Sequence, residues 1–155
     1  MTEPNLRQAA RAWLPAIAWA AVIWHLGGDG FGSAQSDGML RPLLERLLPW
    51  IGPEDLTFVL WLIRRSAHPG VYGVLALLTW RAFARSFPAF SPGRQTAMSL
   101  ALVSAFAAAD ETRQAGSTVR EGHASDVALD IAGGAAALGA RAAWAARRRQ
   151  GKEQA

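Results

Sequence analysis

The sequence of 155 residues contains no cysteine, so disulfide bonds and cysteine-ligated metal centres are excluded. It also lacks a phosphate-binding glycine loop, a dinucleotide fingerprint and a serine in a nucleophile elbow. No tight spacing of histidine and acidic residues favours a metal site. We therefore expect neither a metal nor a cofactor, and the clues to function lie in where the charged side chains fall.

Lysine is nearly absent, and arginine supplies almost all of the positive charge. With 16 Lys+Arg against 12 Asp+Glu, the formal net charge is +4. A basic chain can bind nucleic acid, but these arginines stand at the edges of apolar runs, which is typical of membrane topology. Several of the seven tryptophans also lie at the ends of apolar runs, as interfacial anchors do. We expect membrane lipid as a partner and no nucleic acid.

Four apolar segments predict membrane-spanning helices, at residues 13–28, 56–80, 96–109 and 125–144. The first is shorter than the roughly 20 residues that a span requires, unless the alanines before it extend the helix. A basic start before an apolar run also suits a cleaved signal peptide. Three tryptophans and an internal proline in that run favour a retained helix instead.

Residues 39–50 predict a short amphipathic helix, with leucines on one face and charges on the other. It is too short to span, so we expect it to lie in the membrane interface with Trp50 as an anchor. A helix packed on a soluble core would carry the same stripe. The preceding residues 28–38 predict a loop from their Gly, Ser and Asp content.

The expected fold class is therefore all-α: an integral membrane bundle of about four transmembrane helices plus a short interfacial amphipathic helix. Arginine and lysine gather at the N-terminus, between the second and third segments, and at the C-terminus. These three regions lie on one side of a four-helix arrangement, so both termini should be cytoplasmic. We expect one transmembrane domain over residues 1–146 and a basic cytoplasmic tail over 147–155.

The second apolar segment carries ionisable residues in its first half, namely Arg64, Arg65 and His68. Such groups inside a membrane helix need partners and face the bundle interior or the interface. Pro69 follows directly, where we expect a kink. His68 and Tyr72 are four residues apart and therefore share a helix face.

The other charged residues concentrate in residues 110–134, between the last two apolar segments. Asp110 and Gln114 are one helical turn apart, as are Asp126 and Asp130. Asp130 lies a turn deeper than Asp126, where a carboxyl is costly unless it is protonated, hydrogen-bonded or paired with an arginine. The glycines that follow, at 133 and 134, allow another backbone to approach closely.

Two interpretations of this cluster are open. In the first, acids and a histidine perform acid–base chemistry while guanidinium groups hold an anionic lipid or envelope-precursor head group. The candidate catalytic residues are Asp110, Glu111, His68 and Asp126. The candidate substrate-binding residues are Arg65, Tyr72, Gln114, Arg120 and Asp130. In the second, the same charges pair with one another and tie helix ends together, in a non-catalytic structural or interaction module. A soluble basic helical protein is a third alternative.

These residues resemble the signature of the VanZ-like family. DETRQ, an arginine-bearing loop and SDVALDIAGGAAALG are similar to the family's acidic pair with glutamine, its loop and its small-residue helix. IRRSAHPGVYGVLALL is similar to the head of the family's second helix. The chain departs from the family at Pro69, where an aromatic is usual, and at Asp130, where asparagine is common. It also lacks the proline often found before the loop arginine, here Arg120.

The resemblance covers about residues 13–141 and implies a small, multi-pass protein of the bacterial cytoplasmic membrane, acting in the cell envelope. The family's namesake is associated with reduced susceptibility to the glycopeptide antibiotic teicoplanin, without a mechanism that can be transferred to this chain. The sequence does not fix the substrate, the oligomeric state or whether the protein is an enzyme.

Overall fold

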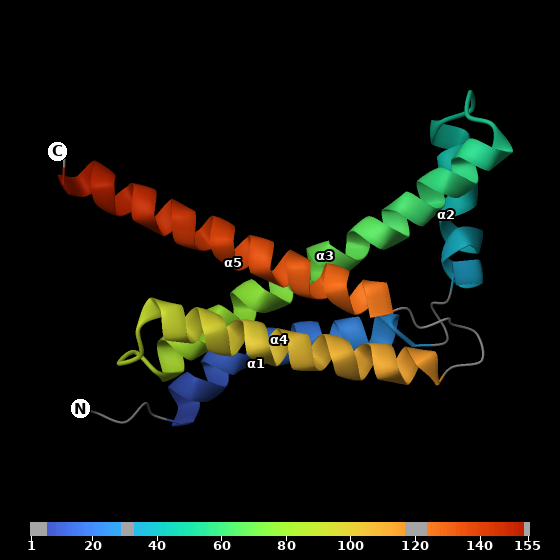
Figure 1. The fold of residues 1–155 in the computed structure, drawn as a ribbon. Helices are drawn as coiled ribbons and strands as arrows, with labels where there is room; N and C mark the ends of the chain where they lie inside the picture. Colours follow the sequence, from blue (N-terminus) through green and yellow to red (C-terminus); the bar gives the residue numbers. More distant parts are fainter. Residues whose placement is uncertain (1–5, 29–32, 117–123, 154–155) are drawn as a thin grey trace.

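The computed structural model describes residues 6–28, 33–116 and 124–153, and these residues form five helices (Figure 1). The helices are α1 (Leu6–Leu26), α2 (Ser33–Leu47), α3 (Pro53–Ser86), α4 (Pro92–Ala115) and α5 (Ala124–Glu153). The described part of the chain contains no strand, so the prediction of an all-α fold is confirmed there. Four long helices and one short helix also match the expected pattern.

Helix α3 is the centre of the bundle and packs on α1, α4 and α5. Helices α1 and α4 run in the same direction, while α3 and α5 run in the opposite direction (Figure 1). The first half of α3 extends beyond the bundle together with α2, and the second half of α5 extends beyond it at the other end. The core between the helices contains Tyr72, Leu75, Ala76, Val103 and Leu138.

Helices α3 and α5 cross at glycine residues. A Cβ atom placed on Gly133 would lie 2.3 Å from the backbone oxygen of Pro69 and 2.4 Å from its Cα. A Cβ on Gly73 would lie 3.3 Å from the backbone oxygen of Gly133. Only glycine at position 133 permits two backbones to approach this closely. The expected close approach of another backbone is thus confirmed at Gly133, whereas a Cβ on Gly134 would meet only side chains, the nearest at 3.4 Å.

Several helices are longer than the sequence predicts. The expected loop over 28–38 is wrong for residues 33–38, which begin α2. Helix α3 continues through Pro69 as far as Ser86, and α5 continues through the basic tail to Glu153. Most residues of the tail are Arg, Gln, Lys or Glu, which favour helix formation, so its charge does not end the helix.

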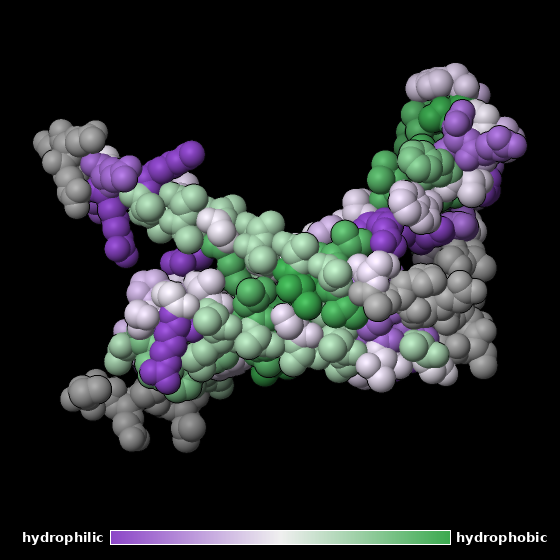
Figure 2. All heavy atoms as spheres, in the orientation of Figure 1, coloured by the Kyte–Doolittle hydropathy of each residue, from purple (hydrophilic) through white to green (hydrophobic). Residues whose placement is uncertain are grey.

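Apolar side chains cover much of the outer surface. Leu14, Ile17 and Leu102 are 65%, 60% and 42% exposed. On the face drawn in Figure 2, hydrophobic residues lie across the middle of the bundle and hydrophilic residues lie toward the helix ends. Within the described residues, no helix is both long enough and apolar enough to be a candidate membrane span.

Candidate functional site

One end of the bundle, where α4 ends and α5 begins, gathers most of the predicted site residues. We call this cluster the polar end. Its side chains come from α3, α4 and α5. It comprises Arg65, His68, Tyr72, Asp110, Glu111, Arg113, Gln114, Asp126 and Asp130.

Asp110 is the centre of the polar end and is only 4% exposed. Its carboxylate accepts hydrogen bonds from Arg113 Nη2 at 2.7 Å and Gln114 Nε2 at 2.9 Å. The Tyr72 hydroxyl donates a third bond at 3.3 Å, which joins α3 to α4. A buried carboxylate with one cation and two neutral donors is well compensated for its lost hydration.

Arg113 connects the hydrogen-bond network of α4 to α1. Its Nη2 donates to the backbone oxygen of Trp24 at 3.1 Å, and its guanidinium lies 4.5 Å from the centre of the Trp24 ring. Gly27 makes room for these side chains. A Cβ atom there would lie 2.6 Å from Arg113 Nη2 and 2.9 Å from Asp110 Oδ1. The end of α1 is therefore part of the polar end's support.

Two pairs join α3 to the first turns of α5. His68 Nδ1 lies 3.1 Å from Asp130 Oδ1, and Asp130 is only 2% exposed. One turn nearer the helix ends, Arg65 Nη1 donates to Asp126 Oδ1 at 2.8 Å. The buried carboxyl of Asp130 therefore has a hydrogen-bond partner, His68, as a carboxyl at this depth requires.

Access differs sharply across the cluster. The side chains of Arg65 and His68 are 31% and 28% exposed, and that of Asp126 is 17% exposed. The side chains of Asp110 and Asp130 are only 5% and 3% exposed. A molecule that reaches this end therefore meets a guanidinium, an imidazole and one carboxylate before it meets the buried acids. His68 has the geometry of a proton-transfer group oriented by a carboxylate.

The structure brings together eight of the nine predicted site residues, all except Arg120. Arg120 and the neighbouring His123 lie outside the described residues. Glu111 is buried beside Asp110 on α4, with 9% exposure. Among the described residues, no group of three or more His, Asp or Glu side chains is placed to hold a metal ion.

Two contacts were missed at the sequence level. Arg113 was not among the candidates, although its spacing of three residues from Asp110 predicts a contact on one helix face. Arg64 forms an ion pair with Asp37 of α2, which holds α2 against α3. No local spacing predicts that pair, because 27 residues separate its members.

Comparisons with models of protein families, with curated proteins and with solved structures gave no match to this chain.

Proposed function

We propose that the chain is a VanZ-like integral membrane protein of the bacterial cell envelope. In this proposal the polar end lies at the outer face of the cytoplasmic membrane. There it binds the head group of a membrane lipid or a lipid-linked envelope precursor. The observation that carries it is the position of the network: the half-buried Arg65 and His68 are more accessible than the buried carboxylates beside them, at one end of a bundle with an apolar surface.

The outward-facing surface supports a membrane location. The hydropathy of a single helix averages side chains that face lipid with side chains that face other helices. In this bundle the polar residues Gln95, Ser99 and Asp110 are buried between helices, while Leu14, Ile17 and Leu102 face outward. Polar groups that face a bundle interior are compatible with a membrane, because their partners satisfy them there.

The charges of the polar end favour a head group that carries both a negative phosphate and a hydrogen-bond donor. Among its described residues, four carboxylates face two guanidinium groups and one histidine. A phosphate would contact the partly exposed Arg65 and His68, since guanidinium groups bind phosphate well. A neighbouring ammonium or hydroxyl group would donate to Asp126. Phosphatidylethanolamine has this combination of groups.

A structural module that ties helix ends together is the second candidate, and the pairing itself favours it. Arg65 is bonded to Asp126, Arg113 to Asp110 and His68 to Asp130. Such a network holds α1, α3, α4 and α5 together without any ligand. In this alternative the exposed side of Arg65 binds nothing.

Substitutions of two neighbouring arginines on α3 distinguish the two candidate functions. Arg65→Gln removes the exposed cation of the polar end, while Arg64→Gln removes its neighbour, which pairs with α2 instead. The full chain is first tested for recovery in the membrane fraction, which the proposal requires. Both variants are then purified in detergent, and retained phosphatidylethanolamine is measured by native mass spectrometry.

The binding proposal expects Arg65→Gln to lose most of the retained lipid at unchanged membrane abundance, with Arg64→Gln close to the parent protein. If lipid and abundance fall in step for Arg65→Gln, the network is structural. Recovery of the parent protein in the soluble fraction without detergent would overturn the membrane proposal.

A further inference from the structure

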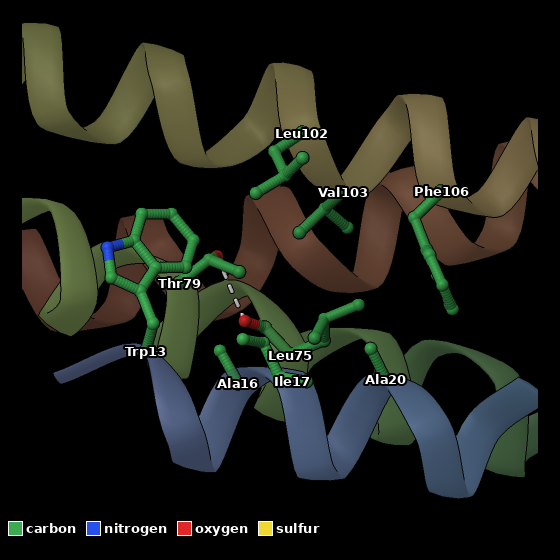
Figure 3. A pocket seen from close by; sticks show the side chains of 9 residues that line it. All are labelled: Trp13, Ala16, Ile17, Ala20, Leu75, Thr79, Leu102, Val103 and Phe106. Atoms are coloured by element: carbon green, nitrogen blue, oxygen red, sulfur yellow. Dashed lines mark hydrogen bonds between the residues drawn. The ribbon is translucent and has the colours of Figure 1, made fainter. Parts of the chain in front are cut away.

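An apolar groove lies between α1 and α4, on the side of the bundle where these two helices flank α3. It has a volume of about 110 Å³ and an almost wholly apolar lining. Its walls are Trp13, Ile17 and Ala20 of α1 and Leu102 and Phe106 of α4, with Leu75 of α3 between them (Figure 3). The side chains of α1 and α4 face each other across the groove (Figure 3), which is partly open to the surface.

Contacts to α3 and α4 fix the position of α1 along the groove. Near its start, Trp13 Nε1 donates to Ser86 Oγ of α3 at 3.1 Å, and the Trp13 and Phe83 rings pack edge to face at 4.9 Å. Near its end, Arg113 of α4 donates to Trp24 O at 3.1 Å. Between them, Trp19 Nε1 donates to the backbone oxygen of Val71 on α3 at 2.9 Å, so α1 is attached at both ends and in the middle of the groove.

Along both α1 and α4, the next helical turn after the groove carries residues of the polar end or of its support. On α4, Phe106 lines the groove and Asp110 follows one turn later on the same face. On α1, Ala20 lines the groove, and Trp24 follows one turn later beneath the Arg113 guanidinium. The Trp24 and Phe106 rings, 6.0 Å apart, form the boundary between the apolar and charged parts.

We infer that the α1–α4 groove binds the hydrocarbon chain of the lipid whose head group contacts the polar end. A lipid matches the order of these two parts of the surface. Its hydrocarbon chain would lie beside the apolar lining, and its charged head group would lie beside the charged cluster. Burying the chain there removes apolar surface both from the groove and from the ligand. The inference deepens the proposed function and rests on it, because the charged end supplies the position of the head group.

The test compares two lipids with one head group and different chains, palmitoyl-oleoyl and dihexanoyl phosphatidylethanolamine. Each is added to the full-length protein in mild detergent, and bound lipid is measured by native mass spectrometry. Ala20→Phe fills the groove, whereas Ala18→Phe makes the same change on an exposed face of α1 that does not line it. Ile17→Trp narrows the groove from its open side, where Ile17 is 60% exposed.

The parent protein and Ala18→Phe should prefer the long-chain lipid. Ala20→Phe and Ile17→Trp should reduce binding of that lipid about tenfold, the effect of losing the burial of roughly two methylene groups. Should Ala20→Phe fail to fold, Ile17→Trp decides, since it changes an exposed side chain. Equal binding of the two lipids by the parent protein, or equal loss in Ala18→Phe, would overturn the groove inference.

Failure of the head-group proposal gives a different pattern. In that case Arg65→Gln leaves the binding of both lipids unchanged, while the preference for the long chain and its loss in Ala20→Phe persist. Failure of the groove inference instead removes the chain preference and leaves the effect of Arg65→Gln intact.

Discussion

The two ends of the bundle hold their helices by different interactions. At the polar end, buried carboxylates of α4 and α5 are bonded to side chains of α3 and α4. At the opposite end, aromatic rings make the contacts: Trp13 packs on Phe83, and Phe87 stacks on Phe90 at 5.2 Å. Charged side chains there, such as Arg94 over Phe90, lie on the outside.

The two kinds of contact differ in how well they tolerate substitutions. Aromatic packing tolerates changes of similar size, because dispersion and burial do not depend on one geometry. A buried charge network tolerates little, since removing one member leaves another unpaired in a medium of low polarity. Aromatic packing is enough to close a helical bundle. The polar end is therefore the better candidate for a functional site.

The largest effect is expected at the α3–α5 crossing next to the polar end. Gly133→Ala places a Cβ atom against the Pro69 backbone, which cannot move aside as a flexible side chain would. We expect a loss of about 3 kcal/mol in the free energy of unfolding, measured by denaturation in detergent. Gly139→Ala is the matched control, because a Cβ there meets no atom within 4 Å. Equal stability of the two variants would contradict the crossing geometry.

The next effect tests the buried network directly. Asp110→Ala leaves Arg113 without its carboxylate and removes the acceptor of Tyr72 and Gln114. Because the Arg113 side chain is 29% exposed and so partly hydrated, breaking this pair should destabilise the protein by about 2 kcal/mol in the same unfolding measurement. Asp37→Ala, which breaks the more exposed pair with Arg64, should cost no more than about 1 kcal/mol. A reversed order would show that the polar end does not depend on Asp110.

A smaller effect is expected at the aromatic end. Trp13→Phe removes the hydrogen bond to Ser86 but keeps a ring next to Phe83, so the loss in unfolding free energy should be about 1 kcal/mol. Trp144→Phe, at a position that is 58% exposed, serves as the control and should change stability less. If Trp13→Phe cost as much as Asp110→Ala, the contrast between the two ends would not hold.

The smallest effect is expected for the exposed cation of the aromatic end. Arg94 lies 3.8 Å from the centre of the Phe90 ring at the start of α4. Because solvent screens an exposed cation–π contact, Arg94→Gln should reduce the unfolding free energy by about 0.5 kcal/mol. The Tm of this variant in detergent should therefore be close to that of the parent protein.

Local sequence patterns predicted part of the candidate site. Pairs within one helix follow from spacing, as Asp110 with Gln114 shows, and Arg113 was within reach of the same rule. Partners on different helices had no such signal. His68 and Asp130 are 62 residues apart and Arg65 and Asp126 are 61 apart, so their contacts depend on how α3 and α5 pack.

The sequence by itself determined the helical class of the described residues, the approximate place of each helix and the charged residues beside the helix ends. Apolar runs and helix-forming residues act over a few turns, so these features are local. Only the tertiary structure decided which charges pair and where the groove lies. Both depend on the contact of Gly133 with Pro69 and on the attachments of α1 at Trp13 and Trp24, which bring distant segments together.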